Sequence, residues 1–336
     1  MGFKWSRFKK RISKSIIETY ASILNKKDKP NEKVLIVTLD ALGDNLVKTK
    51  TIEIIAEYYG SENISILCKD KWADIYKKLG YRTYVDEYKN TLKRAYLYRK
   101  LNKINFKKII YFKHDLSEVQ EYFFPKEKIL EQYMDTKYNY ILEQHIDLLE
   151  KITGKNYTLN DIRPDLKESF KKTDISNTIS IGIGASNRVR TLPVKKMVEI
   201  IKLLLCKYPE KRIVLLGSGK KQVEYTKEIM KIIKNENVIN KVEKISLIET
   251  LEIVANSDLF IGYDSGLVNA AFSFKTKYIC LHWGKVETWW HKFENCKTLI
   301  GDEKNIEKDG VYGTDILNSI TILQVEKALD ELKIKN

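Results

Sequence analysis

The chain of 336 residues lacks the apolar segments that direct a protein into or across a membrane. No run of about eighteen or more apolar residues occurs, which excludes a membrane-spanning helix. The N-terminus has no apolar core of the kind found in signal peptides, which argues against secretion. We therefore expect a cytoplasmic protein. The hydrophobic share of 43% is enough to build two domains of ordinary size.

The patterns of metal-binding and nucleic-acid-binding proteins are also missing. The four cysteines include no CxxC pair and the four histidines no HExxH motif, so we expect reduced cysteines and no structural zinc. No DxD pair of carboxylates is present to hold a divalent ion. The absence of C2H2 spacing and of an RNP-like aromatic string argues against nucleic acid as a partner.

Positive charge is in excess, and it is concentrated at the N-terminus. The chain carries a formal net charge of +15, and residues 1–29 hold nine lysines and arginines against two acidic residues. An apolar stripe at helical spacing runs through the same segment: Trp5, Phe8, Ile12 and Ile16. Such a stripe flanked by cations is typical of a helix that lies in a membrane interface. We expect residues 1–29 to bind the membrane surface, with packing on the protein's own surface as the alternative.

Strand-like apolar runs alternate with helical patterns in the first half of the chain. Strands are expected at 33–38, 64–68, 82–85 and 108–112, with helices at 45–59, 71–79 and 91–101 between them. Residues 126–153 show a helical pattern without strands. A series of βαβ units predicts a parallel sheet.

The second half repeats this alternation. Strands are expected at 178–183, 212–216, 238–240, 259–262 and 277–281, with helices at 194–207, 220–233, 247–255 and 267–272. The predicted organisation is a basic segment 1–30, a first domain 31–165, a linker 166–177, a second domain 178–320 and a terminal helical segment 321–336. That terminal segment could cross back to the first domain.

Two glycine-containing turns, one in each half, follow buried strands and lead into helices. The first reads LDALGDN at residues 39–45, and the second reads YDSG at residues 263–266. In open α/β sheets, ligands bind beyond the carboxyl ends of the strands. The sequence therefore predicts an α/β fold of two doubly wound domains that face each other across one cleft.

Short motifs at the strand ends resemble a known family. They are VLIVT with LDALGD at 34–44, GASN at 184–187, RTLP at 190–193, VLLG at 214–217, ISL at 245–247 and DSGL at 264–267. Their order and approximate spacing, over most of residues 33–293, resemble the bacterial heptosyltransferase family, glycosyltransferase family 9. The resemblance implies a GT-B fold with an acceptor-binding first domain and a nucleotide-sugar-binding second domain. It also implies inverting sugar transfer from a nucleotide-diphosphate donor, with ADP-heptose as the candidate and no metal or cofactor required.

Sugar transfer with inversion needs a carboxylate that takes the proton of the acceptor hydroxyl as its oxygen attacks the anomeric carbon. Asp44, in the first turn, is our candidate for this catalytic base, and the family's base falls on this position. The alternative is that Asp44 only caps the following helix. Asp40 is the second carboxylate of the turn and is expected on the acceptor side.

The leaving nucleoside diphosphate needs groups that neutralise charge on its phosphates. Cations and N–H groups at a helix start can do so, and the candidates are Ser186, Asn187, Arg188, Arg190, Asp264, Ser265 and Gly266. The resemblance implies that Asp264 also accepts hydrogen bonds from the donor sugar, and it aligns Ile245 with a residue beside the nucleotide base. The alternatives are a helix cap for Asp264, a core position for Ile245 and an ordinary surface cation for Arg188.

Three more positions bear on the substrates. Lys113 and His114 follow a predicted strand and could bind an anionic acceptor, or they could lie in a solvated loop. Asn269 stands where family members that use ADP-heptose commonly carry a histidine, so the donor sugar and base stay open.

These features together predict a glycosyltransferase at the inner face of the cell membrane. It would pass a sugar, with heptose as the candidate, from a nucleotide donor to lipopolysaccharide or another surface glycan. Two alternatives remain at this point: a nucleotide-sugar 2-epimerase of similar architecture, and a non-catalytic scaffold that binds membranes.

Overall fold

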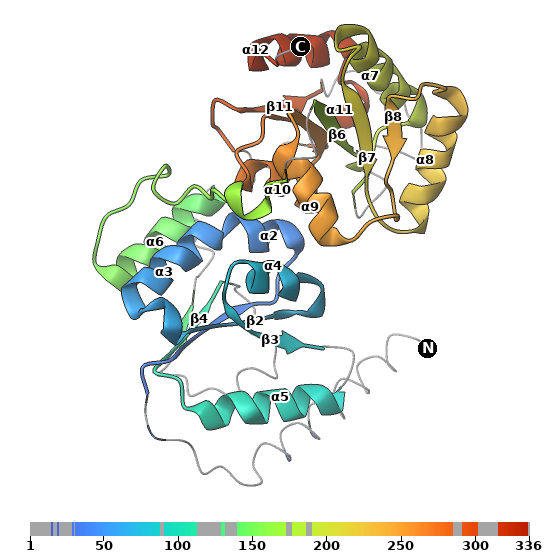
Figure 1. The fold of residues 1–336 in the computed structure, drawn as a ribbon. Helices are drawn as coiled ribbons and strands as arrows, with labels where there is room; N and C mark the ends of the chain where they lie inside the picture. The colour runs from blue at the N-terminus through green and yellow to red at the C-terminus, as the bar shows by residue number, and fades with distance from the viewer. Residues whose placement is uncertain are drawn as a thin grey trace. The chain divides into compact units, whose positions relative to one another are not determined.

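The chain folds into two compact units, each built on its own parallel sheet (Figure 1). The computed structural model describes residues 15, 19, 29, 31–87, 91–112, 129–131, 140–172, 177–185, 190–284, 291–301 and 315–334. Of these, the first unit holds residues up to 41, 48–131 and 142–162, and the second holds 42–47, 140–141 and 163 onward.

The first unit contains a five-stranded sheet in the order β3-β2-β1-β4-β5. Its strands are β1 (Val34–Thr38), β2 (Ile64–Lys69), β3 (Arg82–Asp86), β4 (Lys108–Tyr111) and β5 (Ile129–Glu131). Its helices are α3 (Thr49–Tyr59), α4 (Ala73–Lys78), α5 (Thr91–Ile104) and α6 (Ile141–Thr153), with single turns of 3-10 helix at Ser61–Asn63 and Asp70–Trp72. All five residues of β1 are buried, because helices cover both faces of the sheet: α5 one face, and α3, α4 and α6 the other (Figure 1).

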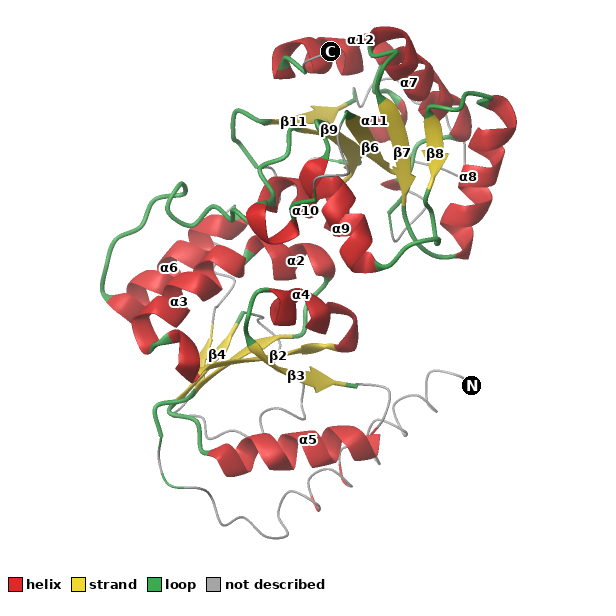
Figure 2. Cartoon of the chain, viewed as in Figure 1, coloured by secondary structure: helices red, strands yellow, loops and turns green. Residues whose placement is uncertain are grey.

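The second unit contains a six-stranded sheet in the order β11-β10-β9-β6-β7-β8. Its strands are β6 (Thr178–Gly182), β7 (Arg212–Leu216), β8 (Val238–Asn240), β9 (Leu259–Tyr263), β10 (Tyr278–His282) and β11 (Cys296–Ile300). Its helices are α2 (Leu42–Val47), α7 (Val194–Lys207), α8 (Lys220–Ile232), α9 (Leu247–Asn256), α10 (Gly266–Ser273), α11 (Asp315–Asn318) and α12 (Ile322–Leu332). Figure 2 shows this alternation of strands and helices.

The predicted strands and helices are confirmed at nearly every position, with two differences in the first half. The stretch 126–153, expected to be without strands, contains β5, which extends the first sheet beside β4. The single helix expected at 45–59 is two helices, α2 and α3, which are separated at Lys48. In the second half β11, which was not predicted, pairs with β10 in parallel.

The terminal helix α12 belongs to the second unit, so the expectation that it could cross back to the first domain is wrong. Its amphipathic face explains this placement. Val325, Ala328, Leu329 and Leu332 are buried in the core that α7 and α8 also line. A Thr321–Gln324 capping box fixes the start of the helix.

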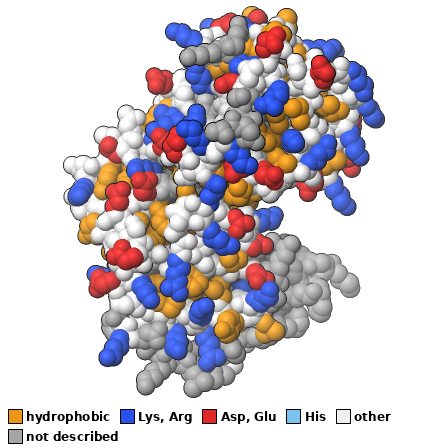
Figure 3. Space-filling view, viewed as in Figure 1, with side chains coloured by type: hydrophobic (Ala, Val, Ile, Leu, Met, Phe, Trp, Pro, Cys, Tyr) orange, Lys and Arg blue, Asp and Glu red, His pale blue; other side chains and the backbone are white. Residues whose placement is uncertain are grey.

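The polar surface is consistent with the dispersed charge of the sequence. Lysine and arginine side chains are spread over the face shown in Figure 3, with acidic side chains between them. No helix within the described ranges is long and apolar enough to cross a membrane.

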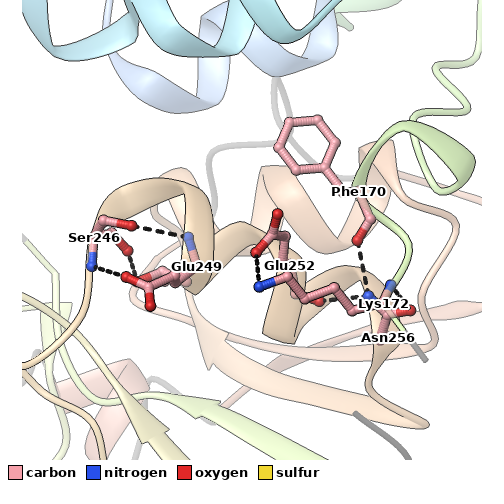
Figure 4. Close-up of polar contacts among 7 residues, drawn as sticks. Phe170, Lys172, Ser246, Glu249, Glu252 and Asn256 are labelled. Carbon is pink, nitrogen blue, oxygen red and sulfur yellow. Dashed lines mark hydrogen bonds and ion pairs between the residues drawn. The ribbon is translucent and has the colours of Figure 1, made fainter. Parts of the chain in front are cut away.

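The segment that follows the first unit is attached to α9 by side-chain hydrogen bonds (Figure 4). Asn256 Nδ2 donates to the Phe170 carbonyl at 2.9 Å, and Asn256 Oδ1 accepts from the Lys172 N–H at 3.1 Å. Lys172 Nζ lies 2.7 Å from the buried carboxylate of Glu252. A one-turn 3-10 helix, Glu168–Phe170, precedes these contacts and buries the Phe170 ring. This part of the predicted linker is therefore held against the second unit.

Replacement of Asn256 by alanine should release this segment. The substitution removes both hydrogen bonds and leaves their backbone partners unsatisfied, at a cost of about 1–3 kcal/mol. We expect trypsin to cleave after Lys171 or Lys172 faster in Asn256→Ala than in the wild type, as measured by mass spectrometry. Ser246→Ala is the matched control, because it removes the cap at the other end of α9 and costs about 1 kcal/mol without touching the segment. Equal cleavage rates in the two variants would contradict the attachment.

Candidate functional site

Sheet topology places both predicted turns where open α/β sheets bind ligands. In the first unit, β2 and β3 lie on one side of β1 and β4 on the other, so the order reverses between β1 and β4. In the second unit, it reverses in the same way between β6 and β9. The crevice beyond the carboxyl ends of such strands is the ligand site of this architecture. Asp40 follows β1, and Asp264 follows β9.

Asp264 is the centre of a polar cluster in the second unit. Its Oδ2 accepts a hydrogen bond from Trp283 Nε1 at 3.0 Å and lies 3.6 Å from Arg190 Nη1. The Arg190 guanidinium also lies over the Trp283 ring, 4.5 Å from its centroid. At 3.6 Å the arginine makes an ion contact beyond hydrogen-bond range, and it keeps a third of its side-chain surface exposed. The cluster therefore presents a cation above an aromatic ring beside a carboxylate.

Tyr263, the last residue of β9, holds the loop that carries Arg190. The Tyr263 hydroxyl accepts from the Leu192 N–H at 3.2 Å, and the Tyr225 hydroxyl donates to the Leu192 carbonyl at 2.7 Å. Both tyrosines are buried. Leu192, two residues after Arg190, is thus fixed to the end of β9, which explains why Arg190 and Asp264, far apart in the sequence, meet at one point.

His282, at the end of β10, is a member of this cluster that the sequence analysis did not predict. Its Nε2 lies 3.8 Å from Asp264 Oδ2, and its Nδ1 lies 2.5 Å from the Gly284 carbonyl. Burial lowers the pKa of His282, and the Arg190 charge lowers it further, against the opposing effects of Asp264 and the Gly284 carbonyl. The imidazole is therefore held mainly in its neutral form.

Helix α10 begins directly after this cluster. Its N-cap is Ser265, which makes no side-chain capping hydrogen bond, and Asp264 lies one residue further out. The alternative in which Asp264 caps the helix is therefore wrong. The first N–H groups of α10 and its positive dipole end lie next to Asp264, as an anion-binding site requires.

Helix α2, which carries Asp44, packs on α10 within the second unit. Two glycines form this crossing. A Cβ on Gly43 would lie 2.4 Å from Asn269 Nδ2, and a Cβ on Gly266 would lie 3.0 Å from the Leu42 Cβ. A side chain at Gly43 would therefore collide with the Asn269 amide, and one at Gly266 would press tightly on Leu42. The two predicted turns are therefore in direct contact.

Asp44 is the third residue of α2, and its side chain is partly exposed. The alternative in which Asp44 is the N-cap is therefore wrong, because the helix begins at Leu42. A carboxylate in the first turn still interacts favourably with the helix dipole.

In the first unit, Asp40 forms a nearly buried ion pair with Lys48. The Lys48 side chain is 3% exposed, and its Nζ also donates to Thr38 Oγ1 at 3.1 Å. Trp72 Nε1 donates to the Asp40 carbonyl at 2.9 Å. Lys48 and Trp72 were not predicted as site residues. Their signal in the sequence is weak, because one lysine and one tryptophan on helical segments usually cover a surface or fill a core.

A neutral histidine lies beside this ion pair. His145, on α6, contacts Thr51 Oγ1 at 3.3 Å through Nδ1 and meets the Phe112 ring edge to face. Lys48 Nζ lies 4.9 Å from the centre of the same Phe112 ring. Burial, with a contribution from the Lys48 charge, lowers the pKa of His145 to about 3.

Several predicted site residues lie outside the described residues: Ser186, Asn187, Arg188, Lys113 and His114. Their roles stay predictions. Ile245 is described and is half-buried, one residue before Ser246, which caps α9. It is not among the residues of the second unit's main core. Among the described residues, no group of three or more His, Cys, Asp or Glu side chains could hold a metal ion.

A family model for glycosyltransferase family 9 (heptosyltransferase) matches residues 87–311, which is more than half of the chain. The chain belongs to this family. It is therefore a glycosyltransferase, which sets aside both the epimerase and the non-catalytic scaffold.

Known family members support this assignment. The chain is 29% identical over 144 residues to lipopolysaccharide heptosyltransferase 1 of Campylobacter coli, and the match spans 42% of each protein. A family 9 glycosyltransferase structure from Veillonella parvula matches with a TM-score of 0.70 and 16% identity over 91% of this chain and 99% of that one. The E. coli heptosyltransferase WaaC with ADP-2-deoxy-2-fluoro heptose matches with a TM-score of 0.68 and 14% identity, over 89% of this chain and 99% of that one. These similarities confirm the predicted GT-B class.

The buried histidine of the first unit predicts a pH-dependent stability. The pKa of His145 is about 3 in the folded glycosyltransferase, against an ordinary value of 6.5, so the unfolded chain binds a proton that the folded chain does not. The stabilisation is complete above about pH 6.5 and is lost as the pH falls toward 3, by up to about 1.4 kcal/mol per pH unit. We expect His145→Gln to reduce this slope in urea unfolding between pH 7 and pH 5.

Thr51→Val is the control, because it changes a neighbour of His145 without removing a titrating group. It should keep the wild-type slope. A slope in His145→Gln equal to that of the wild type would show that His145 is not the group responsible.

Proposed function

We propose that this glycosyltransferase is an inverting, metal-independent enzyme that moves a sugar from a nucleotide-diphosphate donor to a lipid-linked surface glycan. The observation that carries the proposal is the seating of α2, with Asp44, directly against α10, whose N-terminus follows the Asp264–Arg190–Trp283 cluster. This contact supports a site in which a carboxylate acts together with a set of anion-stabilising groups.

Asp44 acts as the catalytic base in this proposal, and the structure gives a reason to prefer it to Asp40. A base must accept a proton, which removes its negative charge. Protonation of Asp40 would leave the buried Lys48 ammonium uncompensated, and breaking such a pair typically costs about 3–5 kcal/mol. Asp44 is partly exposed and lies on a helix whose position α10 fixes. In this proposal Asp44 takes the proton of the acceptor hydroxyl and releases it to solvent.

Arg190 and the N-terminus of α10 stabilise the leaving diphosphate. As the bond from the anomeric carbon to the phosphate oxygen breaks, negative charge grows on that oxygen. A guanidinium and N–H groups at a helix start can neutralise it without a divalent ion. Asp264 accepts hydrogen bonds from the donor sugar, and Trp283 fixes the Asp264 carboxylate by its N–H. Ser186, Asn187 and Arg188 complete the phosphate site, Ser265 and Gly266 contribute its N–H groups, and Ile245 flanks the nucleotide base.

The donor and acceptor are proposed from the relatives. The Campylobacter coli relative is named a lipopolysaccharide heptosyltransferase, and the E. coli structure holds an ADP-heptose analogue. We propose ADP-heptose as the first donor to test and a lipopolysaccharide precursor as the acceptor. Lys113 and His114, which follow β4 in the sequence, are proposed to bind anionic groups of that acceptor.

The basic segment 1–29 is proposed to hold the enzyme on the inner face of the cell membrane, where a lipid-linked acceptor lies. Its net charge of +7 and its apolar stripe support this role. Each cation near an anionic leaflet contributes about 1 kcal/mol, so the segment can bind reversibly.

Replacement of Asp44 by asparagine should abolish transfer while donor binding persists. Asparagine keeps the shape of the side chain but cannot take a proton, and the loss of a general base lowers kcat by about 10²–10⁴-fold. We expect this loss in an assay of nucleoside diphosphate release with ADP-heptose and a lipopolysaccharide precursor, run in excess EDTA. Thermal stabilisation by the donor should be unchanged.

Arg190→Gln is the comparison variant, because it should weaken donor stabilisation as well as turnover. Near-normal turnover in Asp44→Asn would refute its assignment as the base. Loss of wild-type turnover in EDTA, restored by a divalent ion, would refute metal independence.

Deletion of residues 1–29 tests the membrane proposal. The truncated protein should lose sedimentation with anionic vesicles of phosphatidylglycerol, because the cations and the apolar stripe are removed together. Turnover with a soluble acceptor fragment should be retained. Sedimentation equal to that of the full chain would show that another surface binds the membrane, and a matched variant with Trp5 and Phe8 replaced by serine would separate burial from charge.

A further inference from the structure

Three polar side chains from distant parts of the sequence form a hydrogen-bonded chain that ends at α2. The Tyr140 hydroxyl lies 2.7 Å from His291 Nδ1, and His291 Nε2 lies 2.9 Å from Asn269 Oδ1. Asn269 is on α10, and its Nδ2 faces the Cα of Gly43, where a Cβ would lie at 2.4 Å. Tyr140, His291, Asn269 and Gly43 all belong to the second unit.

The middle member of this chain is fixed by its surroundings. The His291 ring is buried and stacks on Phe272 with centroids 3.6 Å apart and planes 5° apart. The Cys296 thiol lies 3.1 Å from the His291 carbonyl. Arg163 lies over the Phe293 ring, 4.3 Å from its centroid, and donates to Asn295 Oδ1. The imidazole therefore has no room to turn away from Asn269.

Because the His291 imidazole is neutral, the hydrogen bonds of this side-chain series all run in one donor-to-acceptor direction. Burial, with a contribution from the Arg163 charge, lowers the pKa of His291 to about 3. A neutral imidazole carries one N–H. With Oδ1 of Asn269 facing the ring, Nε2–H donates to Asn269, and Nδ1 accepts from the Tyr140 hydroxyl. The amide of Asn269 then has its NH₂ group turned toward α2.

We propose that Tyr140, His291 and Asn269 form a brace that positions α2, and through it Asp44, against α10. The inference rests on the proposed role of Asp44 as the base. Asp44 directly follows Gly43. The point at which the Asn269 amide contacts Gly43 therefore sets the position of the Asp44 carboxylate. A displacement of about 1 Å at a reacting group can cost as much as 10²-fold in rate.

The burial of Asn269 separates this role from direct donor recognition. The residue is 7% exposed, its Oδ1 lies 2.9 Å from His291 Nε2, and its Nδ2 packs against Gly43. Asn269 is therefore a positioning residue in this chain, although family members that use ADP-heptose commonly carry histidine there. Its neighbour His291 is supplied by the segment before β11.

A double-mutant cycle between Gly43 and Asn269 tests the contact. Gly43→Ala should collide with the Asn269 amide, lowering both the melting temperature and kcat, the latter by about tenfold or more. Asn269→Ala should lower kcat less, because it removes the brace without a collision. The double variant should recover a large part of what Gly43→Ala loses in both measurements, because the methyl group then has space.

Conservative variants test the hydrogen bonds themselves. Tyr140→Phe keeps the ring and removes the hydrogen bond to His291. His291→Phe keeps an aromatic ring on Phe272 and removes the hydrogen bonds to Tyr140 and Asn269. We expect each to lower kcat about tenfold with donor KM within about twofold, since Asp264, Arg190 and Trp283 are untouched. The two losses should not add in the double variant, because both cut the same chain. Tyr157→Phe is the control, since its hydroxyl donates to Thr153 Oγ1 in the other unit and kcat should not change.

The outcomes separate the inference from the proposed function. A Gly43–Asn269 double variant no better than Gly43→Ala would refute the contact. Unchanged kcat per folded enzyme in Tyr140→Phe and His291→Phe, with only a lower melting temperature, would reduce the chain to a structural role and overturn the inference. If the wild type transferred no sugar, the proposed function would fail, while the melting-temperature cycle would still decide whether Asn269 seats α2.

Discussion

The close crossing of α2 and α10 is the constraint on which the site depends. Two helices approach this closely only where glycine removes the side chain, and Gly43 and Gly266 do so on either side of the contact. Asp44 follows the first glycine in the chain, and Asp264 precedes the second by two residues. The glycines that allow the contact therefore lie close in the sequence to the two carboxylates that the proposed mechanism uses. A larger residue at Gly43 would shift α2 against α10 without altering either carboxylate.

Several polar side chains are buried in the two units, and burying a charged group costs free energy unless the charge is paired or removed. Lys48 is almost fully enclosed and is compensated by Asp40, while His145 and His291 avoid the cost of a buried charge by staying neutral, with pKa values of about 3. Each group thereby fixes its neighbours more strictly than an apolar side chain would. Because Asp40 is paired with the buried Lys48, its protonation would be costly, which supports the proposal that Asp44 is the base.

Strands and helices could be predicted from the sequence where burial of apolar side chains alone determines the secondary structure. Mostly apolar runs such as Val34–Thr38 and Leu259–Tyr263 are buried on both faces, and their alternation with amphipathic helices left one plausible fold class. The strands β5 and β11 were missed because short or polar strands depend on a partner that the local pattern does not show. The position of Asp44 was predicted from a motif, but the brace was not. The contact between His291 and Asn269 joins residues 22 positions apart through side chains, and no periodicity reports such a contact.

The brace also bears on how this enzyme recognises its donor. Asn269 is 7% exposed and its Oδ1 faces His291, so little of its side chain is open to a sugar, and we expect selectivity to come from more exposed groups of the site. Arg190 and Trp283 are the described candidates there, because a guanidinium over an aromatic ring offers both charge for a phosphate and a flat surface for a ring. The position of Asn269, where family members that use ADP-heptose commonly carry a histidine, can thus serve to position a helix in this chain. Membership of the family then fixes the reaction type more firmly than it fixes the sugar transferred.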